Sequence, residues 1–170
     1  MTTFKITDEL IEKIHQLIEE KQNKELTTLL NDLHYADIAE IIHELDIEEG
    51  VYIIRLIDAE KTSDVLTELD DDYRENILKN LSAKEIADEI IELDTDDAVD
   101  IISELPEDRK TEVISHITDV EHAKDIVELL RYGEDTAGGL MAKELVKVNE
   151  NWDVLKCVKE MREQAAHVTR

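Results

Sequence analysis

Residues that favour turns and β-structure are scarce in this sequence. Its 170 residues include four Gly, one Pro and only 4% aromatic side chains, whereas hydrophobic residues make up 42%. A β-sandwich or barrel needs many short strands separated by Gly- and Pro-containing turns, so these fold classes are excluded. The apolar side chains are mainly Leu, Ile, Val and Ala, which suit helices packed on helices, and we predict an all-α fold.

Cysteine and long apolar segments are also nearly absent. Cys157 is the single cysteine, which excludes an internal disulfide and fits a reducing compartment. No run approaches the roughly 18 apolar residues of a membrane span, and Met1–Leu10 lacks the basic start and apolar stretch of a signal peptide. We therefore expect this segment to be soluble and cytosolic.

Basic residues are few as well, because 19 Lys and Arg face 44 Asp and Glu, for a formal net charge of −25. A nucleic-acid partner is not expected, since such proteins neutralise phosphates with Lys and Arg. Cations, basic proteins and water are the remaining partners for so acidic a surface. Gly138 and Gly139 have no phosphate-loop motif around them, and no acid–base pair is distinctive, so we do not expect an enzyme.

An apolar pattern repeats every twelve residues through the middle of the chain. The first column is Leu or Ile throughout: Leu45, Ile57, Leu69, Leu81, Leu93, Leu105, Ile117 and Leu129. A second column, three residues earlier, is equally apolar: Ile42, Ile54, Leu66, Leu78, Ile90, Ile102, Ile114 and Ile126. Residues three apart lie on one face of a helix, so each repeat is expected to form a short helix with one buried stripe.

The residue after each position of the first column is usually one that starts a helix. It is Asp, Ser or Thr in six repeats: Asp46, Asp58, Asp70, Ser82, Asp94 and Thr118. Ser82 with Glu85, and Thr118 with Glu121, match the capping box, whereas Pro106 suits the first position of a helix. Each repeat is therefore predicted to be one short helix that ends where the next begins.

Helices this short are marginal alone, because nucleation is costly, and they persist only when neighbours cover the apolar stripe. We therefore predict a right-handed superhelix, or solenoid, of helices with a 12-residue period. Two further helices, Asp8–Glu20 and Glu25–Asp32, are expected to cap its amino-terminal end. Residues 1–130 form one helical domain in this interpretation.

Nearly all of the negative charge lies in the repeat, where residues 33–130 hold 30 acidic and 8 basic side chains, a net charge of −22. In alternate repeats, carboxylates occupy a position that points about 170° away from the apolar stripe. These outward acids, 24 residues apart, are Glu40, Asp64, Asp88 and Glu112. From the spacing alone, this row is either a solvated face or a surface that binds divalent cations.

The densest acidic cluster comprises Asp94, Asp96, Asp97 and Asp100. Asp96 and Asp100 are four residues apart on one helix face, where like charges repel by roughly 0.2–0.5 kcal/mol. Mg²⁺ or Ca²⁺ would relieve that repulsion, since both ions prefer carboxylate oxygens. The EF-hand pattern is missing from the sequence, and so is the Cys and His spacing of zinc sites.

The periodic pattern stops at Leu130, and three of the four glycines follow in residues 131–141. Residues 131–140 are predicted to be a linker. Glu144–Val148 is then expected to form a short strand, and Trp152–Gln164 an amphipathic helix. One strand and one helix cannot bury a core of their own, so residues 141–170 are interpreted as the opening of an incomplete domain.

Leu33–Ile42 has the sequence LHYADIAEII and Arg131–Met141 has the sequence RYGEDTAGGLM, and both segments resemble the MgtE family of magnesium transporters. Leu33–Ile42 is similar to the start of the family's amino-terminal domain, which typically has LHPADIAE. Arg131–Met141 looks like the family's junction between its helical domain and its first CBS domain. Tyr35 departs from the family pattern, which usually has Pro at this position.

The resemblance implies a cytosolic Mg²⁺-sensing domain, followed by a CBS pair, a connecting helix and a five-helix membrane domain in a homodimeric, multi-pass membrane protein. In the family, Mg²⁺ bridges the helical domain to the CBS pair and favours the closed pore. The implied Mg²⁺ ligands are Asp64, Asp96 and Asp100, with Asp97 adjacent. Where Asp64 stands, the family often has the longer Glu.

Two other functions fit the residues. The first is a helical module like those of the flagellar rotor switch, which would continue as helix after the Gly pair. The second is an acidic scaffold for a basic protein partner, which would respond to Mg²⁺ only as it responds to ionic strength.

Overall fold

The computed structural model describes residues 6–133 and 136–168, and within these ranges the chain forms eleven helices. They are α1 (Asp8–Glu19), α2 (Asn23–Asn31), α3 (Tyr35–His43), α4 (Ile47–Ile54), α5 (Ala59–Glu68), α6 (Asp71–Asn80), α7 (Ala83–Ile90), α8 (Thr95–Ser103), α9 (Glu107–His116), α10 (Val120–Leu129) and α11 (Val154–Val168). No strand occurs among the described residues, which confirms the predicted all-α class. None of the described helices is both long and apolar enough to cross a membrane.

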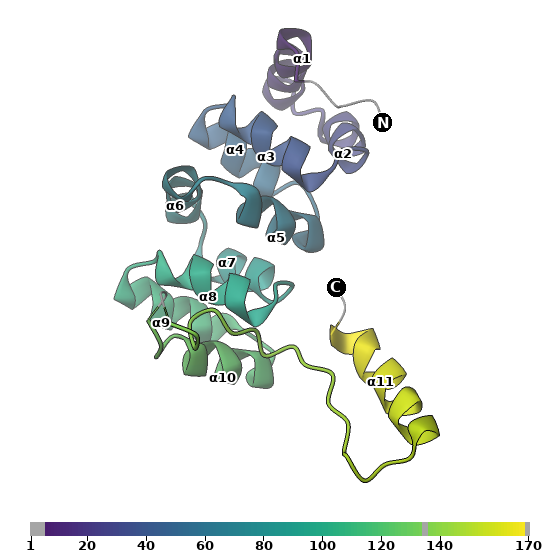
Figure 1. The fold of residues 1–170 in the computed structure, drawn as a ribbon. Helices are drawn as coiled ribbons and strands as arrows, with labels where there is room; N and C mark the ends of the chain where they lie inside the picture. Colours follow the sequence, from purple (N-terminus) through teal and green to yellow (C-terminus); the bar gives the residue numbers. More distant parts are fainter. Residues whose placement is uncertain (1–5, 134–135, 169–170) are drawn as a thin grey trace.

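The helices α1 to α10 stack into an elongated array, with α1 at one end and α10 at the other (Figure 1). Each helix of the repeat packs mainly on the helix two places along the chain, as α3 does on α5, α5 on α7, α7 on α9 and α8 on α10. Two twelve-residue repeats therefore make one layer of the stack. The predicted superhelix of short helices is present, and its amino-terminal layer is formed by α1 and α2, as expected.

Both apolar columns of the repeat lie in the core. Every member of the first column is buried, and so is every member of the second except Ile114, which is half-buried. Ile114 lies in α9 and lines an open groove with Ile117, Val120 and Ala123 at the last layer of the stack. The stripe is less covered there because no further repeat helix packs on α9 and α10 among the described residues.

Asp46, Asp58 and Ser82 cap repeat helices with their side chains, as predicted, whereas Asp70 and Asp94 stand at the predicted N-cap positions without a side-chain cap hydrogen bond. Asp46 and Ser82 form reciprocal capping boxes with Glu49 and Glu85, so two backbone N–H groups of each first turn find acceptors. The prediction that Thr118 caps the last repeat helix is wrong. Asp119 is the N-cap of α10, because its carboxylate accepts hydrogen bonds from both the Glu121 and the His122 N–H groups.

Pro106 stands at the N-cap of α9, one residue before the first helical position, so the prediction that it starts this helix is confirmed. A proline at the N-cap still ends the preceding helix, because it has no N–H to donate to that helix.

Basic side chains bind the carboxyl-terminal ends of several helices. The Lys61 Nζ donates to the carbonyl oxygens of Leu30, Asn31 and Leu33 at 2.9–3.1 Å, just after α2. Arg109 donates in the same way to the Leu81 carbonyl at 2.7 Å, at the end of α6. Helix ends carry unpaired carbonyls and a partial negative charge, so a cation there stabilises the stack.

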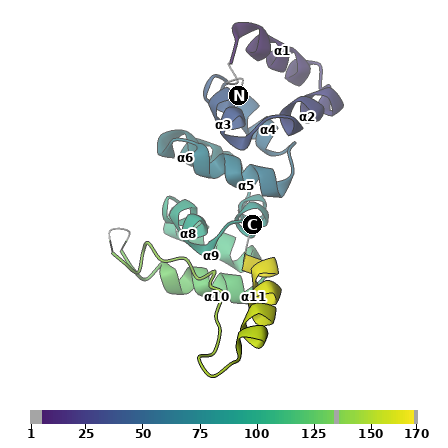
Figure 2. The same ribbon diagram turned by 45° about the vertical axis from the view of Figure 1, so that its right-hand side comes forward.

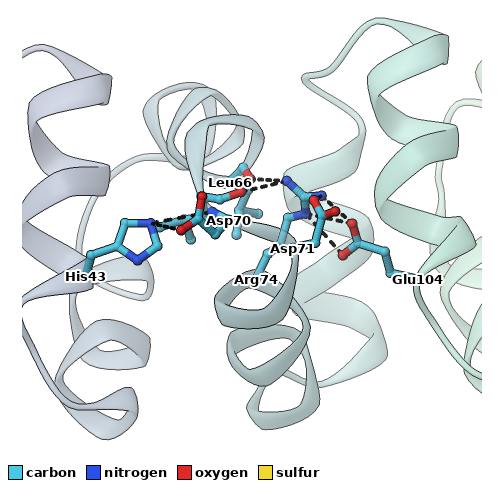
Figure 3. Close-up of polar contacts among 7 residues, drawn as sticks. His43, Leu66, Asp70, Asp71, Arg74 and Glu104 are labelled. Atoms are coloured by element: carbon cyan, nitrogen blue, oxygen red, sulfur yellow. Dashed lines mark hydrogen bonds and ion pairs between the residues drawn. The ribbon is translucent and has the colours of Figure 1, made fainter.

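Arg74 is the most buried of these cations, with 8% of its surface exposed. Its guanidinium donates to the carbonyls of Leu66 and Leu69 at 3.2 and 3.0 Å, and it pairs with the carboxylates of Asp71 and Glu104 (Figure 3). The Glu104 hydrogen bond is the main reason that the pKa of Arg74 is raised. Arg74 thus links the end of α5 to the end of α8 through α6.

The segment after the repeat leaves the stack and carries α11 at its far end, as Figure 2 shows. The predicted strand at Glu144–Val148 is wrong, since these residues have no strand pairing. Their polar groups bond to helices instead: the Lys147 N–H donates to the Gln164 Oε1 at 2.7 Å, and the Gln164 amide donates back to the Lys147 carbonyl. A strand needs a neighbouring strand, and the described residues supply none.

The predicted helix at Trp152–Gln164 corresponds to α11, which begins two residues later and continues to Val168. The apolar side chains of this amphipathic helix remain open to solvent. Leu155 is 84% exposed, and Val158 and Met161 are 40% and 47% exposed. The tail, residues 141–168, therefore has an apolar helix face on which no other described element packs closely enough to bury it.

A candidate divalent-cation surface

Asp64 lies on the outer side of α5. The two residues before it, Thr62 and Ser63, are fully buried, and the Ser63 hydroxyl lies 2.8 Å from the Ala59 carbonyl of its own helix and 2.6 Å from the Glu89 carbonyl of α7. With those side chains turned inward, the next position points outward, and Asp64 is exposed. The predicted outward direction of this repeat position is confirmed.

The other three predicted ligands lie on α8. The inner face of this helix consists of Ala98, Val99, Ile101 and Ile102, all buried. Asp97 and Asp100 are exposed on its outer side, and Asp96 is half-buried in the first turn. The amphipathic pattern of α8 therefore sets where its carboxylates point.

The structure brings Asp64 within electrostatic range of α8. The pKa of Asp97 is raised, first by partial removal of its carboxyl from water and then by repulsion from Asp96, Asp94, Asp100 and Asp64. Because Asp64 belongs to α5, its effect on Asp97 shows that carboxylates of two different helices share one negative field. These residues define the α5–α8 acidic surface: Asp64, Asp94, Asp96, Asp97 and Asp100.

These carboxylates do not close around a cation by themselves. Within residues 6–133 and 136–168, no three His, Cys, Asp or Glu side chains converge as a metal site. Mg²⁺ commonly keeps several of its waters and takes only one or two protein carboxylates. The α5–α8 acidic surface fits such a partial site, in which further ligands come from water or from another part of the protein.

The other outward acids of the alternate repeats, Glu40, Asp88 and Glu112, are not part of the α5–α8 acidic surface. Asp88 pairs with Lys84 on its own helix at 2.5 Å, so a cation already sits beside it. Glu40 and Glu112 are exposed on α3 and α9. The row is therefore not uniform, and Asp64 is its member that acts on the Asp97 carboxyl of α8.

Two polar features of this region could not be found from the repeat pattern. The first is Glu144, whose carboxylate accepts hydrogen bonds from the N–H and the hydroxyl of Thr95, at the start of α8. The second is Glu89 on α7, whose buried Oε2 has no hydrogen-bond partner among the described residues. Burial, followed by repulsion from Asp88, Asp58, Glu85 and Glu92, raises the pKa of Glu89 to about 7.

The fold and this surface define an acidic helical-repeat domain. The family model described as the MgtE intracellular N domain matches residues 33–135, so the chain belongs to this family. No curated protein sequence matches the chain.

Two solved structures are similar to the chain over most of its length. One is the soluble part of a magnesium transporter, with a TM-score of 0.76, 24% identity and 96% of this chain covered. The other is the cytosolic domain of the Mg²⁺ channel MgtE in complex with ATP, with a TM-score of 0.82, 25% identity and 94% covered. The chain spans 64% and 65% of the lengths of these two proteins.

Proposed function

We propose that this chain is a Mg²⁺-sensing regulatory domain of an MgtE-type magnesium transporter or channel. Membership in the family of the MgtE intracellular N domain supports the proposal. The observation that carries it is the α5–α8 acidic surface, where five carboxylates from two helices lie close enough that four of them add to the effect of partial burial in raising the pKa of Asp97. Like charges held this close repel, and a divalent cation between them and an opposing surface would lower that repulsion.

Three of the basic residues are engaged away from this surface. Lys61 and Arg109 bind carbonyls at helix ends, and Arg74 binds such carbonyls together with the Asp71 and Glu104 carboxylates, which lie outside the α5–α8 acidic surface. A soluble cation is a natural counter-charge for that surface.

In the whole protein, we propose that a CBS pair follows residue 140, that a membrane domain follows the CBS pair, and that two copies form a homodimer. Mg²⁺ would join the α5–α8 acidic surface to the CBS domains and favour a closed pore. Family membership favours this function over a flagellar rotor module. In this scheme Asp64, Asp96 and Asp100 bind the ion directly or through water, and Asp97 adds charge beside them.

The proposal is tested by small-angle scattering of the complete cytosolic region during a Mg²⁺ titration. Mg²⁺ should compact the particle more than NaCl at equal ionic strength, because screening alone does not bridge two surfaces. Replacing Asp64, Asp96 and Asp100 with Asn should raise the Mg²⁺ concentration needed for compaction. A matched control replaces the exposed Glu40, Glu60 and Glu112 with Gln, which removes the same number of charges elsewhere.

Two results would contradict the sensor. If NaCl compacts the region as well as Mg²⁺ does, the surface is an acidic scaffold that responds to ionic strength. If the Asn and Gln variants shift the titration equally, total charge matters and these three residues hold no ion.

A further inference from the structure

The superhelix has a seam between two of its layers. On one side of the stack, α3 packs on α5, α5 on α7 and α7 on α9 without interruption. On the other side, α4 packs on α6 and α8 packs on α10, but among the described residues α6 and α8 do not pack on each other to a similar extent. The layer of α5 and α6 is therefore joined to the layer of α7 and α8 mainly through the α5–α7 contact (Figure 1).

Polar bonds replace part of the apolar packing at this seam. The Ser63 hydroxyl of α5 lies 2.6 Å from the Glu89 carbonyl of α7, and the Arg74 guanidinium of α6 pairs with Glu104 at the end of α8. Ser63 and Arg74 are two of the four polar side chains that are buried among the described residues. Polar groups can exchange such bonds for bonds to water, whereas apolar side chains lose their burial, so the seam is the layer boundary expected to open most readily.

The Glu89 carboxyl lies at the α5–α7 contact with one oxygen that has no partner. Its Oε2 is buried, and no described residue forms a hydrogen bond with it. Negative charges surround this carboxyl: Asp88, Glu85 and Glu92 on its own side of the seam, and Asp58 at the start of α5. An ionised carboxylate is costly to bury without a partner, so burial and repulsion both favour the protonated form.

The basic side chains of α7 and of the two helices that pack on it are engaged elsewhere. Each Lys and Arg of α5, α7 and α9 has another partner: Lys61 binds the Asn31 carbonyl, Lys84 binds Asp88, Arg109 binds the Leu81 carbonyl, and Lys110 binds Glu107. An ionised Glu89 therefore gains no counter-charge while the seam stays closed. Opening of the seam would give the carboxylate water instead.

We propose that the seam is a hinge between two halves of the superhelix, α1–α6 and α7–α10, and that Glu89 is its proton-dependent latch. The latch holds the halves together when the carboxyl is protonated and lets them part when the carboxyl is ionised. The hinge does not depend on the proposed Mg²⁺ sensing.

The direction of the pH effect follows from the two states. The pKa of Glu89 is about 7 in the closed seam, because of burial and repulsion, against an ordinary value of 4.5. The closed state therefore binds the proton more tightly, and the closed state is favoured at low pH and loses this advantage as pH rises through 7. If opening returns the carboxyl to water, the ratio of open to closed molecules should rise about tenfold between pH 6 and pH 8.

The hinge is tested by pulsed electron paramagnetic resonance, which measures the distance between two spin labels. Glu68 of α5 and Glu112 of α9 are exposed on opposite halves, and labels are attached through Glu68→Cys and Glu112→Cys after Cys157→Ser removes the native thiol. Between pH 6 and pH 8, the ratio of long to short distances should rise about tenfold for this pair. A control pair within the first half, Glu40→Cys with Glu68→Cys, should keep one distance.

Three carboxyl variants separate the latch from the general charge of the chain. Glu89→Gln cannot ionise and should keep the short distance at both pH values. Glu60→Gln is the matched control, since it removes an exposed carboxylate of α5 and should open as the natural chain does. Asp58→Asn keeps an acceptor for the Lys61 N–H at the start of α5 but removes the repulsion across the seam, so it should open less at pH 8.

The hinge and the latch fail in different ways. An unchanged distance between the labels at positions 68 and 112 from pH 6 to pH 8 would overturn both. Opening that persists in Glu89→Gln would leave a hinge but overturn the latch, and equal opening in Asp58→Asn and the natural chain would contradict repulsion across the seam.

Discussion

The superhelix and the tail are built from similar amphipathic sequence but differ in what covers them. In the repeat, Ile90 and Leu93 are 0% and 6% exposed, because the next layer of helices lies against them. In the tail, Val154 and Leu155 are 77% and 84% exposed, although α11 is longer than any repeat helix. An apolar pattern and a long helix therefore do not ensure that the apolar side chains are buried. Burial requires a neighbouring helix that packs on them, and this difference between the superhelix and the tail can be tested by mutation.

Core truncation should give the largest effect. Ile90→Ala removes a fully buried side chain between layers and should lower the free energy of unfolding by about 3–4 kcal/mol. Leu155→Ala should change it by less than about 0.5 kcal/mol, because that side chain is already in water. Urea unfolding of both variants measures the difference. Equal losses would mean that α11 is covered in solution.

The buried cation comes next. Arg74→Ala should destabilise the stack by about 3 kcal/mol, because it leaves the Glu104 carboxylate and the Leu66 and Leu69 carbonyls without their donor. Arg162→Ala, at an exposed position of α11, should have almost no effect. Circular dichroism during chemical unfolding would compare the two. A small loss in Arg74→Ala would show that water replaces the guanidinium.

Glu89 should make the stability of the superhelix depend on pH. Its folded-state pKa of about 7 lies above the ordinary value, so the folded chain binds a proton that the unfolded chain releases between about pH 4.5 and pH 7. Stability from this group is thus present at low pH and lost as pH rises through 7. The shift corresponds to about 3 kcal/mol at most, and solvent screening of the partly exposed carboxyl should reduce the loss to about 2 kcal/mol.

Glu89→Gln cannot ionise and should flatten this dependence between about pH 5 and pH 8, as measured by urea unfolding at several pH values. The raised pKa of Asp97 changes stability with the same sign. An unchanged slope in Glu89→Gln would assign the pH dependence to other groups.

Helix caps should give the smallest effects. Ser82→Ala removes the capping box of α7 and should destabilise the stack by about 1 kcal/mol. Asp153 accepts the Lys156 N–H at 2.9 Å at the start of α11, yet Asp153→Ala should leave the unfolding of the stack unchanged, since the tail adds no buried core. Thermal unfolding would rank the two variants, and a larger loss for Asp153→Ala would reverse the comparison.

The sequence was sufficient to predict the features that repeat at a fixed spacing along the chain. The buried columns follow from periodicity, and the position of Asp64 on the outside follows from the same period. The prediction that Thr118 is an N-cap was wrong because Asp119, one residue later, offers a stronger acceptor, and residue type alone does not decide between two adjacent candidates. The predicted strand at Glu144–Val148 was wrong because a strand forms only when a second strand pairs with it.

The polar contacts between residues far apart in the chain could not be predicted from the sequence. Arg74 meets Glu104 across about 30 positions, and Glu144 meets Thr95 across nearly 50, and neither spacing follows from the period. Asp64 and Asp97 could be paired only through the resemblance to the family. Their shared field became visible once α5 and α8 were placed in space.

Packing between every second helix has a kinetic consequence. Because α3 meets α5, α5 meets α7 and α7 meets α9, most contacts between different helices of the stack join residues only about 24 positions apart. Closing such short loops costs little entropy, so any neighbouring pair of layers can form first and the rest can add to it. The stack should therefore fold quickly from more than one starting point, and a chain still being synthesised could complete layer upon layer as each 24-residue stretch emerges.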